Sequence, residues 1–207
     1  LMAELPYEGD CYDLTITPDA AARAREIVAS LGLPAGTRLV GINTGCGPVF
    51  ETKAWTIEGF MGLCDELAGG GDVAVVLLGG AREKPLHDQI LAGIAPASRG
   101  RVLDGGTSNP LEVFFALVDQ LDAVVSADTL AMHVAIALRK HVVAFFGPTC
   151  HQEIDLYGRG EKIITDYPCS PCYLKRCDVR PSCMQALAPA TVAAATRRVL
   201  AAAAAAR

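Results

Sequence analysis

The sequence lacks any uninterrupted apolar run close to the roughly 18 residues that a membrane-spanning helix needs. It has no basic run either, and its formal net charge of −5 argues against nucleic acid as the main partner. No basic or apolar stretch opens the chain, so no signal peptide is expected. The G-x-G-x-x-G fingerprint is missing, which disfavours a nicotinamide-dependent oxidoreductase. We therefore expect a cytoplasmic protein, with a peripheral position on the cytoplasmic face of the membrane as a second expectation.

The chain does contain a regular alternation of buried strands and amphipathic helices. Its 207 residues, 51% of them hydrophobic and 20% charged, are typical of one well-buried α/β domain. We expect a linker strand and helix over residues 1–36, followed by a Rossmann-like, doubly wound parallel sheet over residues 37–207. Apolar runs without polar alternation predict strands at 37–43, 73–78, 101–103, 123–126 and 142–146, and helices are expected at 17–31, 56–67, 83–94, 110–120, 129–138 and 189–206.

In such a sheet, ligands bind beyond the carboxyl ends of the strands. The first of these loops runs from Thr44 through two glycines to Lys53. Glycine lets the backbone approach a phosphate closely, and Lys53 would add a positive charge. The alternative is an ordinary glycine turn followed by a solvent-exposed lysine.

The second loop begins with Gly79 and Gly80 and reaches Glu83. A carboxylate at this place can accept hydrogen bonds from both hydroxyls of a ribose. The alternative is a glutamate in the first turn of a helix, where the helix dipole favours a negative charge.

The third loop, Asp128 to His133, enters a helix directly after a buried strand. Asp128 is expected to be the N-cap of that helix, while Thr129 and the neighbouring amides donate to phosphate oxygens. His133 lies four residues beyond Thr129 and hence on nearly the same helical face. A cationic histidine there would offset the charge that grows on a departing nucleotide.

Four cysteines crowd into a proline-rich segment, at Cys169, Cys172, Cys177 and Cys183. In a reducing compartment such a cluster predicts a structural metal site, and four thiolates suit tetrahedral zinc. The spacing differs from the common ferredoxin pattern, which makes an iron–sulfur cluster the weaker expectation. Disulfides are the remaining alternative, and four cysteines allow three pairings.

Together these motifs resemble glycosyltransferase family 9, which contains the ADP-heptose:lipopolysaccharide heptosyltransferases. The resemblance covers residues from about 38 to 200 and is carried by Lys53-x-Trp55, Leu78-Gly79-Gly80 with Glu83, Asp128-Thr129-x-x-x-His133, Phe146-Gly147-Pro148-Thr149 and the segment Cys169 to Cys183.

The resemblance is to the C-terminal, donor-binding half of a two-domain GT-B enzyme. It implies that Lys53 contacts the donor diphosphate, that Glu83 contacts the ribose, and that the loop from Asp128 to His133 holds the diphosphate and the sugar. The general base of an inverting transfer is expected in an N-terminal domain that no part of this chain matches. We therefore expect no catalytic residue here, no cofactor for the chemistry, and no activity of the chain alone.

The expected function is donor binding for the transfer of heptose from ADP-heptose to a lipopolysaccharide-type acceptor, with the acceptor glycolipid bound through the missing domain. Leu130 stands where many family members carry glycine, which leaves another nucleotide sugar open as the donor. The alternative function is a non-catalytic nucleotide- or metal-binding module centred on the four cysteines.

Overall fold

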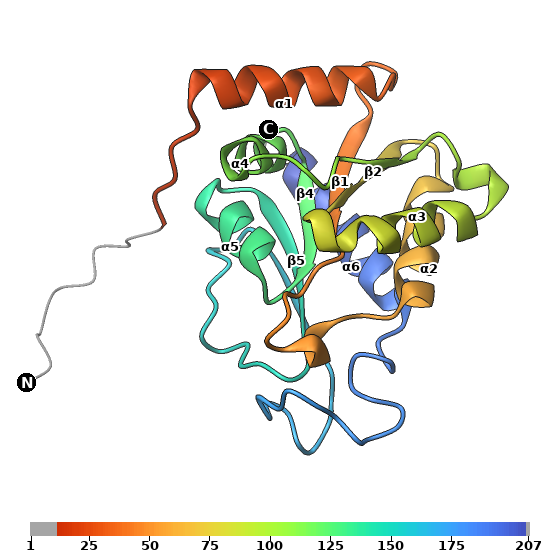
Figure 1. Cartoon of the computed structure of the whole chain (residues 1–207), viewed down its shortest axis with the longest axis vertical. Coiled ribbons are helices and arrows are strands. Elements are labelled where there is room, and N and C mark those ends of the chain that lie inside the picture. The colour runs from red at the N-terminus through yellow and green to blue at the C-terminus, as the bar shows by residue number, and fades with distance from the viewer. Residues whose placement is uncertain (1–11, 206–207) are drawn as a thin grey trace, which may run out of the picture.

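A computed structural model describes residues 12–205. Six parallel strands form one sheet in the order β3-β2-β1-β4-β5-β6, which confirms the doubly wound arrangement (Figure 1). All five predicted strands are present, and the sheet gains an edge strand that has no continuous apolar run. The strands are β1 (Arg38–Asn43), β2 (Val73–Leu78), β3 (Val102–Asp104), β4 (Ala123–Ala127), β5 (His141–Phe146) and β6 (Gly160–Ile164).

Helices cover both faces of the sheet, as the apolar strands require. One core cluster joins the sheet to α2, α3 and α6, and a second joins its other face to α1, α4 and α5. The helices are α1 (Pro18–Ser30), α2 (Ile57–Ala68), α3 (Lys84–Gly93), α4 (Leu111–Asp119), α5 (Leu130–Ala137) and α6 (Pro189–Ala205), with short 3-10 turns η1 (Glu51–Lys53), η2 (Ala81–Glu83) and η3 (Pro96–Ser98).

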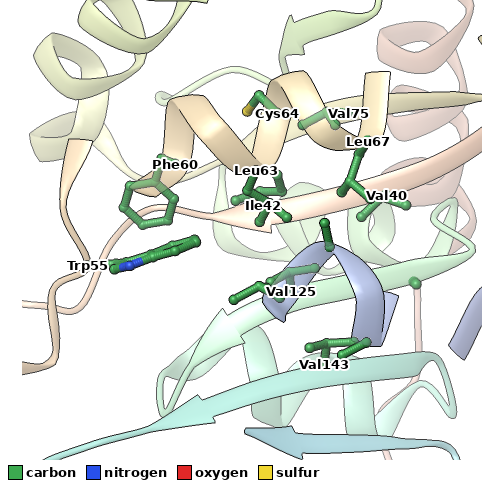
Figure 2. Close-up of a cluster of buried hydrophobic side chains, with 14 of the residues drawn as sticks. Val40, Ile42, Trp55, Phe60, Leu63, Cys64, Leu67, Val75, Val125 and Val143 are labelled. Carbon is green, nitrogen blue, oxygen red and sulfur yellow. The ribbon is translucent and has the colours of Figure 1, made fainter. Parts of the chain in front are cut away.

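The core beneath α2 shows how the sequence pattern becomes packing. Thr56 caps the helix by accepting a hydrogen bond from Gly59 N at 2.9 Å. Leu63 and Leu67, one helical turn apart, face the apolar side chains of β1, with Trp55 and Phe60 closing one end (Figure 2). The run of apolar residues in each strand is therefore explained by burial on both faces of the sheet.

The first helix, α1, lies across α4 (Figure 1). Its Ala20 and Ala24 are almost fully buried in the contact. The predicted helix is thus present and packs on the domain. Residues 12–17, ahead of it, form no strand, and the rest of the expected linker strand falls within residues 1–11, outside the described part. The division of the chain at residue 36 stays a prediction. No helix within residues 12–205 is long and apolar enough to cross a membrane.

Candidate functional site

The carboxyl edge of the sheet holds a cavity of about 570 Å³. It lies beside the point where the strand order reverses, between β1 and β4, which is where ligands bind in sheets of this type. Because the strands are parallel, the loops that follow β1, β2, β3 and β4 meet at this edge. Each loop contributes lining residues, among them Asn43, Lys53, Glu83, Asn109 and Leu130.

Lys53 connects the loops on the two sides of the point where the strand order reverses. It ends η1, after β1, and its Nζ donates to the backbone carbonyl of Asp128, after β4, at 2.6 Å. An ammonium group has three hydrogens to donate, so this contact leaves two of them for a ligand. The lysine is therefore held in the lining of the cavity, and its contact with a phosphate stays a prediction.

The entry to α5 is organised around Thr129. The prediction that Asp128 caps this helix is wrong, because the N-cap residue is Thr129. In the described structure its hydroxyl makes no capping bond and instead lies 3.1 Å from Asn43 Nδ2 and 2.9 Å from Ser126 Oγ. The network joins the ends of β1 and β4 and leaves the first-turn amides of α5 without a bond from their N-cap side chain.

Asp128 turns to His133 instead of capping the helix. Its Oδ1 lies 3.6 Å from His133 Nε2, and the aspartate side chain is only 22% exposed against 42% for the histidine. The adjacent His133 ring holds the pKa of Asp128 below its usual range, aided by the Lys53 charge and the Thr149 hydroxyl and opposed by burial. Asp128 thus stays a carboxylate at neutral pH, beside the cavity that Thr129 and Leu130 line.

Glu83 lies in the lining on the opposite side, after β2. Its Oε2 accepts a hydrogen bond from Gly80 N at 2.8 Å, which fixes the carboxylate and leaves Oε1 for other donors. The side chain fits only because Gly45 has none: a Cβ on Gly45 would lie 2.9 Å from Glu83 Cδ. The glycines of the first two loops therefore make room for a carboxylate as well as for a ligand.

Thr44 lies beneath the cavity and not in its lining. Only 4% of the residue is exposed, and its hydroxyl contacts His87 Nε2 at 3.0 Å. Thr44, the first residue of the loop expected to bind the donor and itself predicted to contact it, therefore turns its side chain into the protein.

Leu130 forms part of an apolar rim. Leu130 is 54% exposed and Leu111 is 55% exposed, and both line the cavity together with Phe114. An apolar rim beside polar loop atoms is typical of a small-molecule site. Leu130 thus lies where its side chain restricts the room for a ligand.

The four clustered cysteines line a second cavity, of about 470 Å³. All four are free thiols, and burial raises the pKa of Cys183, with smaller contributions from the charges of Cys172 and Cys177. Across residues 12–205, no three or more His, Cys, Asp or Glu side chains are grouped so that they could hold a metal ion. The structure therefore does not support the prediction that these thiols are arranged around zinc.

Several residues of the site were missed by sequence reasoning. Asn43, a polar residue that ends an apolar strand, carried a signal that could have revealed it. Ser126, near the end of β4, and Asn109, in the loop after β3, were not assigned a role. His87 and Asp104, which make a hydrogen bond of 2.9 Å under the cavity, had no sequence signal because they come from a helix and a separate strand.

Comparisons with known proteins show which family the chain belongs to. The model of glycosyltransferase family 9 (heptosyltransferase) matches residues 3–182. Lipopolysaccharide heptosyltransferase 1 of Pseudomonas aeruginosa is 28% identical over 138 residues, which are 66% of this chain and 37% of that protein.

Solved structures show the same fold at lower identity. The ADP-heptose lipopolysaccharide heptosyltransferase II of E. coli superposes with a TM-score of 0.73 at 20% identity, over 96% of this chain and 56% of that one. The dodecameric iron-containing heptosyltransferase TibC, solved with ADP-D-beta-D-heptose, gives 0.62 at 14% identity, over 84% and 48%. The chain thus spans about a third to a little over half the length of these relatives. The match of the family model over most of the sequence shows that the chain belongs to glycosyltransferase family 9.

Proposed function

We propose that the chain binds the nucleotide part of a donor sugar, with ADP-heptose as the donor, for an inverting glycosyl transfer. The observation that carries the proposal is the cavity at the reversal of strand order, which gathers Lys53, Glu83 and the start of α5 from three separate loops. These groups differ in charge and in hydrogen-bonding capacity, as the parts of a nucleoside diphosphate do.

The diphosphate is assigned to the side of the cavity between Lys53 and α5. The two free ammonium hydrogens of Lys53 and the first-turn amides of α5 provide donors for phosphate oxygens, and the positive end of the helix dipole favours an anion. His133, paired with Asp128, would add positive charge as the diphosphate departs. These donors would stabilise the leaving group without any metal ion.

The nucleoside is assigned to the other side of the cavity. Glu83 Oε1 is placed to accept from the ribose hydroxyls, since Oε2 is taken by Gly80 N. The apolar side chains of Leu111 and Phe114 offer a surface for the planar base. The adenine base is inferred from relatives whose names specify ADP-heptose.

The other half of the reaction is assigned to parts that this chain does not supply. The general base and the binding site for a lipopolysaccharide-type acceptor are expected in the remainder of a two-domain enzyme, consistent with the partial coverage of the relatives. A glycolipid acceptor would place the enzyme at the cytoplasmic face of the membrane, as a peripheral protein. The chain alone should bind the donor and transfer nothing.

Calorimetric titration of the 207-residue chain with ADP, UDP and GDP tests the proposal. ADP should bind most tightly, because the relatives that name a nucleotide name ADP. Preference for another nucleotide would overturn the adenine assignment, and the absence of binding to all three would overturn the proposed function. Sugar transfer by the isolated chain would contradict the assignment of the general base.

A second candidate function is suggested by the cavity that all four clustered cysteines line. Although the described arrangement of residues 12–205 does not group these thiols for a metal, we propose that they close around zinc when it is present, with iron as the alternative because TibC is described as iron-containing. Elemental analysis of the chain purified without chelator should then find a stoichiometric metal that Cys177→Ser removes and Cys46→Ser, outside the cluster, retains. Metal-free protein, or equal metal content in both variants, would exclude this site.

A further inference from the structure

One buried histidine lies under the proposed nucleotide cavity and connects three of the loops around it. His87, on α3, is 0% exposed. Its Nδ1 is 2.9 Å from Oδ1 of Asp104, the last residue of β3, and its Nε2 is 3.0 Å from the hydroxyl of Thr44, the first residue after β1. Neither ring nitrogen is free to contact a ligand.

The three side chains satisfy one another's hydrogen bonds. A carboxylate only accepts, so His87 Nδ1 carries the hydrogen that binds Asp104, whose Oδ1 also accepts from Gly106 N at 2.9 Å. With a neutral ring, Nε2 accepts from the Thr44 hydroxyl. With a cationic ring, Nε2 donates to Thr44, whose hydroxyl can then donate to Leu78 O at 3.3 Å. The chain of bonds therefore stays complete in both protonation states.

The same histidine is packed against atoms that shape the cavity. A Cβ on Gly79 would lie 3.0 Å from His87 Nε2 and 2.7 Å from Glu83 Cβ, so the three residues are in close contact. Gly45, the neighbour of Thr44, approaches the Glu83 carboxylate equally closely. A shift of the histidine or of Thr44 would therefore change the position of the carboxylate in the lining.

We propose that Thr44, His87 and Asp104 form a positioning relay, which sets the spacing of the nucleotide-binding loops through a histidine that does not touch the nucleotide. The inference rests on the proposed function for its ligand. The structural part of the inference can be tested without a ligand. Gly80 N–H donates to the Glu83 carboxylate, and Gly106 N–H donates to Asp104. Hydrogen exchange of these two amides therefore reports on the carboxylate that the relay positions and on the Asp104 end of the relay.

The test is a double-mutant cycle of Thr44→Val and Asp104→Ala in the full chain. Each variant leaves a buried partner unsatisfied, so each should weaken ADP binding about tenfold and accelerate exchange of Gly80 N–H. The double variant should be no weaker than the single ones, because both break the same chain of bonds. Thr44→Ser keeps the hydroxyl and should bind as the wild type does.

Additive effects would mean that Thr44 contacts the nucleotide directly, which would overturn the relay. So would unchanged affinity and exchange in the two variants, or weak binding by Thr44→Ser with normal exchange of Gly80 N–H. Ile90→Val is the control for lost stability, because Ile90 lies on the same helix, is also fully buried and belongs to the apolar core. If the wild type binds no ADP, the proposed function fails, while the exchange rates still decide the relay.

Discussion

Replacing Lys53 by alanine should weaken ADP binding roughly 10- to 100-fold, because a hydrogen bond to a charged group contributes about 1.5–3 kcal/mol and about 1.4 kcal/mol is tenfold in Kd. The lysine is the one side chain of the first loop that reaches across to the carbonyl of Asp128, at 2.6 Å. Its loss removes both the charge opposite the diphosphate and the link between the two loops. Titration calorimetry at fixed ionic strength measures the effect.

A matched lysine on the same chain controls for the change in net charge. Lys84 is exposed at the start of α3 and pairs with Asp88, outside the lining of the cavity. Lys84→Ala should therefore bind ADP as the wild type does. Equal affinity of the Lys53→Ala variant and the wild type would show that the diphosphate lies elsewhere.

Replacing Trp55 by alanine should lower the free energy of unfolding by about 3–5 kcal/mol, the usual cost of removing a large buried aromatic side chain. Trp55 is 6% exposed, and its ring centroid lies 5.3 Å from Phe60 and 5.4 Å from Phe145. Its Nε1 donates to Leu187 O at 3.1 Å, which ties the segment after Lys53 to the chain before α6. Urea unfolding followed by circular dichroism measures the loss.

A phenylalanine at this position separates packing from hydrogen bonding. Trp55→Phe keeps an aromatic ring but leaves the Leu187 carbonyl without its donor, so we expect a loss of about 1–3 kcal/mol, less than for alanine. Equal stability of the Trp55→Ala variant and the wild type would contradict the role of Trp55 as an anchor of the core.

The fold could be predicted because its central strands are buried on both faces. Residues 73–78 form a strand with the predicted bounds, and the other four predicted strands differ by one or two residues at their ends. Strand β6 was missed because Gly160–Ile164 is a half-buried edge strand, in which polar and apolar residues mix. Burial from one side leaves no continuous apolar run to detect.

The site could be predicted only as a set of loops. Lys53, Glu83, Thr129 and Leu130 were expected to contact a donor, and all four line the cavity. The direction in which the Thr44 side chain points and the identity of the residue that caps α5 were not predictable, because both depend on contacts with distant residues. Thr44 meets His87, 43 residues away, and Thr129 meets Asn43, 86 residues away.

By itself the sequence determined the alternation of strands and helices, the parallel sheet, and the loops in which chemically useful side chains lie. These are local properties, since hydrophobic period and turn residues act over a few positions. Only the tertiary structure decided which side chains meet. The strand order places β1 beside β4 and so brings Lys53 to Asp128 across 75 residues. The packing that buries both faces of the sheet fixes which strands, and hence which loops, are neighbours.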